Sequence, residues 1–155
     1  WMEEIALEQA TTERPVSVIR ASNVQGVPIT GPPGNGLLHK WASEAPIGWV
    51  NVPGDGSDFK DFVHVQDLVE CIMRVMADPP PTRESIAIGS GKGIQLRDLA
   101  AIYNQMTGCE AEYGQNQDQE VFGIVDASEV EMRLGFRPTV SLEEMIKESF
   151  EASGH

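Results

Sequence analysis

The sequence predicts an α/β protein, and three observations support this fold class. Helical and strand periods alternate along the chain, the strand-like segments are short and bounded by Pro or Gly, and several helical segments carry capping residues. The chain has 155 residues, of which 41% are apolar. This length and composition are sufficient for one folded domain with its own core.

The N-terminal part of the chain is expected to begin with a helix over residues 1–12. A strand over residues 15–20 follows, and apolar side chains on both of its faces predict that it is covered on both sides. A loop rich in Pro and Gly then leads into a helix over residues 37–45. The segment "GWVNV" predicts the next strand, which ends in a Pro-Gly-Asp-Gly turn at residues 53–56.

The remainder of the chain continues the alternation. The predicted strands are 59–65, 85–89, 110–114 and 121–126, and the predicted helices are 66–77, 95–108, 126–135 and 141–153. Three prolines after Asp78 end the first of these helices, and Gly108 closes the second. The last two helices each show a capping-box spacing, with Asp126 and Ser141 as the capping residues.

The overall charge excludes several classes of partner. The formal net charge is −13, so the chain has no basic excess with which to neutralise nucleic acids or anionic membranes. No apolar run approaches the ~20 residues of a membrane-spanning helix. The two cysteines, Cys71 and Cys109, form no Cys-x-x-Cys pair, and the three histidines lack metal-ligand spacing. We therefore expect a reduced cytoplasmic protein without a metal site and a buried Cys71 thiol.

Two glycine-rich stretches resemble nucleotide-binding loops but lack the residues that such loops need. "TGPPGNGLLHK" has the glycine spacing of a Walker A loop, yet Leu37 and Leu38 stand where Lys and Ser or Thr are required. "GSGKG" follows a strand and precedes a helix, but Ile94 replaces the third glycine of a dinucleotide-binding turn. Neither stretch predicts a phosphate-binding loop.

Four longer segments carry a resemblance that no single one of them would support. They are "IRASNVQGVP" (19–28), "VPGDGSDFKDFVHVQDLVECI" (52–72), "IAIGSGKGIQLRDLA" (86–100) and "VDASEVEMRLGFRPTVSLEEMI" (125–146). In this order and spacing they resemble the C-terminal half of the extended short-chain dehydrogenase/reductase family, the NAD-dependent epimerases and dehydratases of nucleotide sugars. The resemblance covers essentially the whole chain.

The resemblance implies a particular fold. It would be the C-terminal part of an NAD(P)-binding Rossmann-like fold, with the last parallel strands and a small mixed α/β substrate domain but without the N-terminal dinucleotide-binding portion. Residues 1–155 would form a single partial domain. Residues 1–28 would be a remnant of the Rossmann part, and residues 29–155 would be mostly the substrate-binding lobe, with strand 85–89 returning to the Rossmann sheet.

The resemblance also implies functional residues. Ala21 and Ser22 would lie near the nicotinamide end of the cofactor. The residues that would bind a nucleotide sugar are Asn23, Asn35, Gly36, Leu37, Asn51, Pro53 and Lys60. Two of these have ordinary alternatives, since Asn23 could form a turn after its strand and Lys60 could be a surface lysine. The chain departs from the family pattern where Lys60 replaces an Arg that would give a bidentate contact, and where Asn116 replaces a second Arg.

The largest departure concerns catalysis. Aligning the family's glutamate with Glu4 places the catalytic Lys of the Tyr-x-x-x-Lys motif immediately before Trp1, and neither Tyr103 nor Tyr113 has a Lys four residues later. The chain is therefore predicted to be inactive on its own, with no catalytic residue. The full-length family uses NAD or NADP, whereas this chain alone is expected to bind no cofactor and, at best, to bind a nucleotide sugar weakly. The alternative is a non-enzymatic module that binds a ligand, associates with itself or complements a separate NAD-binding half.

Overall fold

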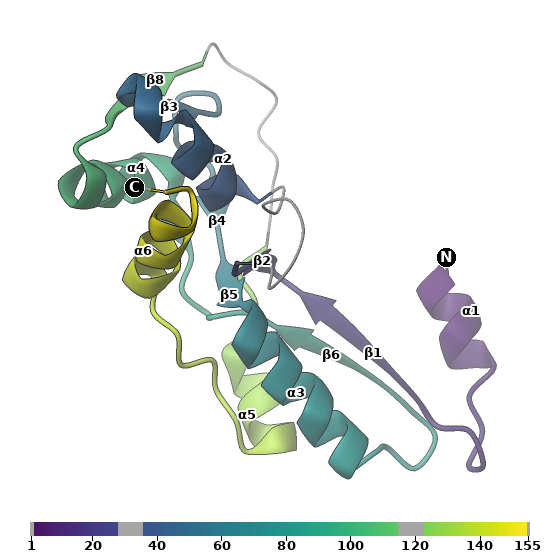
Figure 1. The fold of residues 1–155 in the computed structure, drawn as a ribbon. Coiled ribbons are helices and arrows are strands. Elements are labelled where there is room, and N and C mark those ends of the chain that lie inside the picture. The colour runs from purple at the N-terminus through teal and green to yellow at the C-terminus, as the bar shows by residue number, and fades with distance from the viewer. Residues whose placement is uncertain (1, 28–35, 115–122, 155) are drawn as a thin grey trace.

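The computed structural model describes residues 2–27, 36–114 and 123–154, which form two lobes of α/β structure (Figure 1). The helices are α1 (Met2–Glu8), α2 (Leu37–Glu44), the short 3-10 helix η1 (Ala45–Ile47), α3 (Val65–Ala77), α4 (Leu96–Thr107), α5 (Ala127–Leu134) and α6 (Leu142–Ala152). The strands are β1 (Val16–Ala21), β2 (Asn23–Gln25), β3 (Trp49–Val52), β4 (Phe59–Lys60), β5 (Phe62–His64), β6 (Arg83–Ile88), β7 (Ile94–Gln95) and β8 (Glu110–Tyr113). The strands pair as β1–β6, β2–β5 and β3–β8 in parallel and as β4–β7 in antiparallel.

The larger lobe consists of β3, β8, α2, α4 and α6. Its core joins side chains from all three helices to the inward residues of β3 and to Phe62. Trp41, Leu99 and Ile146 are fully buried there, and Trp41 and Tyr103 meet edge to face with their ring centroids 5.4 Å apart. Apolar side chains that recur at helical spacing in α2, α4 and α6 account for this packing.

The smaller lobe consists of the β1–β6 pair with α3 and α5 against it and α1 beside β1 on the opposite side (Figure 1). Its core includes Cys71 and Val75 from α3, Ile86 and Ile88 from β6, and Val130 from α5. Burial raises the pKa of the Cys71 thiol, as expected for a buried cysteine. Helix α1 has no buried residue.

Strand β5 joins the two lobes. Successive residues of a strand point to opposite faces, so Phe62 enters the core of the larger lobe and Val63 enters the core of the smaller one. Both side chains are at most 3% exposed. The two cores are therefore built on neighbouring residues of one short strand.

Several predicted element boundaries need correction. The strand expected over residues 59–65 is interrupted at Asp61, whose buried carboxylate turns away to bind another loop. Residues 123–126 form no strand, and residues 121–122 of that prediction lie outside the described part of the chain. Strand β1 has α1 on one side and α3 on the other, as its sequence predicts, but this cover is incomplete because none of its residues is buried.

The helix caps give one confirmation and one correction. Ser141 and Glu144 form a complete capping box at α6, as the spacing predicts. Asp126 caps α5 by accepting a hydrogen bond from the Ser128 amide at 2.9 Å, and the spacing of Asp126 and Glu129 gives no reciprocal box. Helix α4 ends at Gly108, which adopts the left-handed conformation that glycine tolerates.

Candidate functional site

A pocket of about 270 Å³ lies where α2, β4, the start of β2 and the end of β3 meet. Its described lining residues are Asn23, Leu37, Lys40, Pro53, Lys60, Phe62 and Leu96. Four of the seven residues predicted to bind a nucleotide sugar, Asn23, Leu37, Pro53 and Lys60, therefore line one cavity. They come from four different segments of the chain, and the fold is what brings them together.

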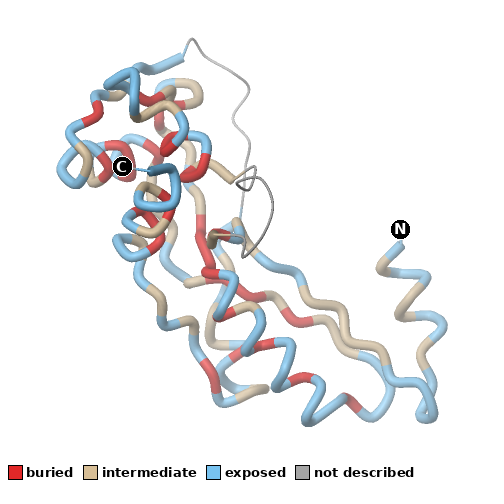
Figure 2. The backbone as a smooth tube through the Cα atoms, in the orientation of Figure 1, coloured by how far each residue is buried: buried red, intermediate tan, exposed pale blue. Residues whose placement is uncertain are grey.

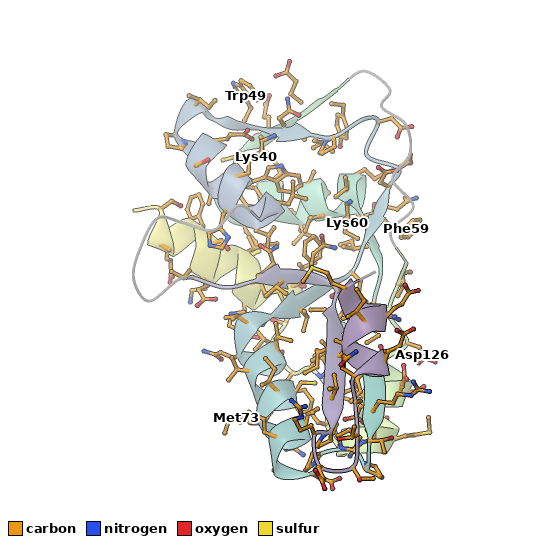
Figure 3. All side chains as sticks on the ribbon, turned by 90° about the vertical axis from the view of Figure 1, so that its right-hand side faces the viewer. Lys40, Trp49, Phe59, Lys60, Met73 and Asp126 are labelled. Carbon is orange, nitrogen blue, oxygen red and sulfur yellow. The ribbon has the colours of Figure 1, made fainter. Side chains whose placement is uncertain are left out.

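Two lysines reach this pocket from different elements. Lys60 belongs to β4, and Lys40 lies in the first turns of α2; both are labelled in the upper part of Figure 3. The Lys40 Nζ atom lies 3.8 Å from Glu44 Oε1, an exposed pair one helical turn apart that is weak in water. Sequence reasoning missed Lys40, because none of the family motifs includes it. The pocket thus holds two cationic side chains where the motif predicted one.

The position of Asn23 in the pocket is fixed by two hydrogen bonds. Its side-chain nitrogen donates to the Asp61 carbonyl at 2.8 Å, and its backbone nitrogen donates to the same oxygen at 3.1 Å. The double contact fixes the orientation of the side-chain amide. These contacts fit the turn-forming role that the sequence left open for Asn23. Asn23 nevertheless lines the pocket.

Two other predicted residues, Asn51 and Gly36, are not among the described residues that line the pocket. Asn51 lies in β3, where its backbone nitrogen donates to Glu44 Oε2 at 2.9 Å and its carbonyl accepts from Trp41 Nε1 at 2.8 Å. Gly36 is the N-cap of α2, and a side chain there would come within 2.9 Å of the buried Gln25 amide. Asn35 lies outside the described residues.

The predicted cofactor residues follow β1. Ala21 is its last residue and is exposed, and Ser22 comes next, with a backbone nitrogen that donates to the Ile88 carbonyl at 2.8 Å. The Ser22 hydroxyl is buried and finds no partner among the described residues, as does Gln25 Oε1. Buried polar atoms normally have hydrogen-bond partners, so these two atoms are exceptions, together with His39 Nε2 and the Tyr103 hydroxyl.

The glycine turn after β6 has a structural role instead. The Asp61 carboxylate accepts hydrogen bonds from the backbone nitrogens of Ser90 at 2.9 Å, Gly91 at 3.3 Å and Val125 at 3.0 Å. A side chain at Gly89 would lie 2.5 Å from this carboxylate. The amides that would cradle a phosphate in a dinucleotide-binding turn are therefore already used within the protein.

The two tyrosines of the chain differ in their surroundings. Tyr103 is fully buried between Trp41 and Phe150, and burial raises the pKa of its hydroxyl. Tyr113 lies half exposed at the end of β8. In the described ranges, no cluster of three His, Cys, Asp or Glu side chains has the arrangement of a metal site. The helices of the same ranges are also too short or too polar to cross a membrane.

Comparisons with known proteins identify relatives of the chain. It is 30% identical to GDP-L-fucose synthase 1 of Arabidopsis thaliana over 105 residues, which cover 66% of this chain and 32% of the relative. It is 29% identical to dTDP-L-rhamnose 4-epimerase of Burkholderia thailandensis over 150 residues, which cover 88% of this chain and 39% of the relative. The chain thus spans between about a third and two fifths of the length of these curated relatives. No protein-family model matches it.

The fold also has solved counterparts. The chain superimposes on UDP-glucose-4-epimerase from Stenotrophomonas maltophila, solved with bound NAD and formylated UDP-arabinopyranose, with a TM-score of 0.81 and 20% identity. The match covers 99% of this chain and 52% of the epimerase. At this identity the likeness establishes the fold alone, an α/β architecture with parallel strands.

Fold and relatives together define the class of protein. The chain has the architecture of about half of a Rossmann-like nucleotide-sugar enzyme. It is a relative of the NAD-dependent nucleotide-sugar epimerases and dehydratases of the extended short-chain dehydrogenase/reductase family, which confirms the resemblance predicted from its four segments.

Proposed function

We propose that this chain forms the nucleotide-sugar-binding half of an NAD-dependent epimerase/dehydratase-like protein and is not catalytic by itself. The observation that carries the proposal is the shared pocket of Asn23, Leu37, Pro53 and Lys60, into which Lys40 also projects. Asn23, Leu37 and the stretch from Pro53 to Lys60 are separated in the sequence, and their meeting in one cavity supports a common role in binding.

The chemistry of the pocket suits a sugar diphosphate. The ammonium groups of Lys40 and Lys60 supply positive charge to the pocket. Because the chain as a whole has a net charge of −13, only these two groups, and not the overall charge, would attract an anionic ligand. The side chains of Leu37, Phe62 and Leu96 give the pocket an apolar surface against which a base or sugar ring can pack. Because Lys makes a point contact rather than the bidentate contact of Arg, we expect weak binding.

Ala21 and Ser22 would contribute the edge of a nicotinamide site. The buried Ser22 hydroxyl without a partner fits a contact to such a group, and the exposed Ala21 leaves space beside it. When bound, the dinucleotide supplies hydride transfer chemistry. The residues of this chain would orient it at one edge only, so we expect no measurable NAD binding by the chain alone.

Calorimetric titration tests the proposal. UDP-glucose, dTDP-glucose and GDP-mannose are titrated into the wild-type chain, and the best ligand is then titrated into Lys40→Ala, Lys60→Ala and the double variant. Each single change is expected to weaken binding roughly tenfold, the value of one charge-assisted contact. Lys147→Ala, which removes an exposed lysine on α6 outside the pocket, is the matched control. Binding that the double variant leaves unchanged would contradict the proposal, as would the absence of binding to all three ligands.

A second candidate function is association through the smaller lobe. Strand β1 pairs only with β6 among the described strands, and α3 exposes Val69, Met73 and Met76. An open strand edge beside exposed apolar side chains favours pairing with a second copy or with a separate NAD-binding half. Sedimentation at high protein concentration tests self-association, and a monomer at all concentrations would remove it.

A further inference from the structure

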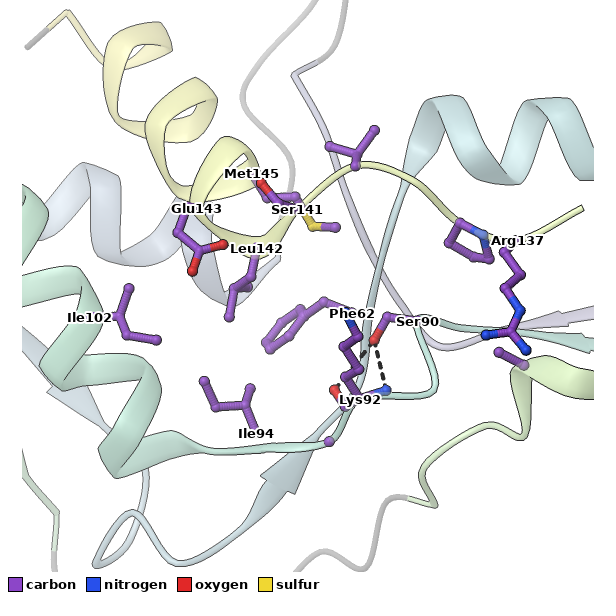
Figure 4. A pocket seen from close by; sticks show the side chains of 14 residues that line it. Phe62, Ser90, Lys92, Ile94, Ile102, Arg137, Ser141, Leu142, Glu143 and Met145 are labelled. Carbon is purple, nitrogen blue, oxygen red and sulfur yellow. Dashed lines mark hydrogen bonds between the residues drawn. The ribbon is translucent and has the colours of Figure 1, made fainter.

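A second and larger cavity lies on the other side of Phe62 from the nucleotide-sugar pocket. Its volume is about 480 Å³, within the range of small-molecule sites. It is enclosed by α4, the first turn of α6, the segment before α6 and the turn that follows β6 (Figure 4). Phe62 lines both cavities, so its ring forms part of the wall between them.

The middle of this cavity is apolar. The side chains that line it are Phe62, Ile94, Ile102, Leu142 and Met145. Phe62 and Met145 are at most 3% exposed and belong to the core of the larger lobe. These two side chains are therefore held rigidly by the core, which favours binding of an apolar group without rearrangement.

The rim carries opposite charges at separate places. Lys92 belongs to the turn after β6, near Ser90, whereas Glu143 belongs to the first turn of α6 (Figure 4). In this view the Phe62 ring lies between the two charged groups. Neither side chain forms an ion pair with another residue in the described ranges, and they do not pair with each other. Arg137 also lines the cavity but is already engaged with Glu131.

The backbone of Lys92 is fixed by a hydrogen bond within the turn that follows β6. The Ser90 hydroxyl accepts a hydrogen bond from the Lys92 nitrogen at 3.1 Å and itself donates to Asp61 Oδ1 at 2.6 Å. The capping box of Ser141 and Glu144 likewise fixes the helix start that carries Glu143. Lys92 and Glu143 thus belong to backbone segments that are fixed by hydrogen bonds, and both line the same apolar cavity. This arrangement suits a ligand with an anionic group at one end and a cationic group at the other.

We propose that this cavity binds a small amphoteric molecule. Its anionic group would contact Lys92, its apolar body would pack on Phe62, Ile94 and Leu142, and its amine or other donor would contact Glu143. The site is independent of the nucleotide-sugar pocket, because it requires neither Lys40 nor Lys60. The larger lobe would then bind two ligands, a nucleotide sugar in the smaller pocket and an amphoteric molecule in this cavity.

An NMR titration of the isotope-labelled chain tests the site with three matched probes. The probes are 4-(aminomethyl)benzoate, benzoate and benzylamine, which share one ring and differ only in their charged groups. We expect 4-(aminomethyl)benzoate to bind roughly tenfold more tightly than either of the others, since it alone carries both an anionic and a cationic group. The shifted amide signals should be those of Gly93, Ile94 and Leu142.

Variants then assign the two contacts. Lys92→Glu should weaken 4-(aminomethyl)benzoate at least tenfold, and Glu143→Gln should reduce its affinity to that of benzoate. Both residues are exposed, so each variant should retain the dispersed spectrum of the folded chain. Arg14→Glu, a charge reversal in the exposed turn after α1 that is not part of the cavity lining, should leave all affinities unchanged. Equal binding of the three probes, binding that neither variant alters, or no binding at all would each overturn the proposal.

Discussion

The parallel strand pairs of the two lobes, β3–β8 and β1–β6, are similar in construction and differ in their surroundings. In the larger lobe, Val50 and Val52 of β3 are fully buried beneath α2 and α4. In the smaller lobe, β6 buries Ile86 and Ile88, whereas no residue of β1 is buried (Figure 2). Parallel strands normally lie under helices on both faces. The larger lobe is thus closed around its core, whereas the smaller lobe leaves β1 only partly covered.

The difference predicts unequal contributions to stability. Ile146 in α6 is fully buried, while Ile19 in β1 is only partly buried against the smaller core. Ile146→Ala should lower the free energy of unfolding by about 2–5 kcal/mol, because it leaves a cavity among well-packed side chains. Ile19→Ala should lower it by no more than about 1–2 kcal/mol, since less apolar surface returns to water.

Urea denaturation followed by circular dichroism measures both variants, and the shared Ile→Ala chemistry makes each the control for the other. Equal losses would show that the smaller lobe is as tightly packed in solution as the larger one. A larger loss at Ile19 than at Ile146 would contradict the comparison, and would point to a covered β1 of the kind that self-association provides.

Two buried carboxylates connect segments that lie far apart in the chain, and they give a second, smaller effect. Asp61 accepts four hydrogen bonds, from Ser90 N, Ser90 Oγ, Gly91 N and Val125 N. Asp67 accepts three, from Thr139 N, Thr139 Oγ1 and Val140 N. Asp→Asn would turn an acceptor into a donor that faces other donors, and should cost about 1–3 kcal/mol at either position.

We expect the larger loss at Asp61, because it holds one more donor. Asp98→Asn, which neutralises an exposed carboxylate in the first turn of α4, is the control for the change of charge. Chemical denaturation of the three variants gives the comparison. An Asp61 variant as stable as the Asp98 variant would show that the segments are held by their apolar contacts alone.

These carboxylates also show where sequence reasoning stops. Asp67 stands in the first turn of α3, a position that a favourable helix dipole explains, and nothing nearby indicates a partner 72 residues away. Helices such as α2, α3, α4 and α6 could be predicted because their apolar spacing and caps are local signals. The same local signals failed at β4 and β5, where Asp61 interrupts the strand to reach a distant loop.

The candidate site was predictable to a similar extent. Family motifs identified Asn23, Leu37, Pro53 and Lys60, and the fold brings these four into one pocket. Lys40 could not be identified in this way, because its role depends on the direction of α2 relative to β4. The second cavity had no signal either, since Lys92 and Glu143 are 51 positions apart and become neighbours of one cavity only after folding.

The smallest expected effect concerns α1, which tests the open side of the smaller lobe directly. Glu3 pairs with the Arg20 guanidinium on β1 through both of its carboxylate oxygens, with one Nε–Oε2 distance of 3.0 Å, and this hydrogen bonding lowers the pKa of Glu3. A lowered pKa in the folded state means that the contact contributes fully above the ordinary glutamate pKa. The contribution is lost as the pH falls through the lowered value.

Glu3→Gln should therefore speed amide hydrogen exchange in α1 at neutral pH and leave global unfolding nearly unchanged. In acid, the exchange rates of the variant and the wild-type chain should become equal. Glu8→Gln, at the other end of the same helix, should change neither. If the Glu3 variant exchanged no faster than the Glu8 variant, α1 would be held to β1 by contacts other than this ion pair, and the smaller lobe would be less open on that side than its burial indicates.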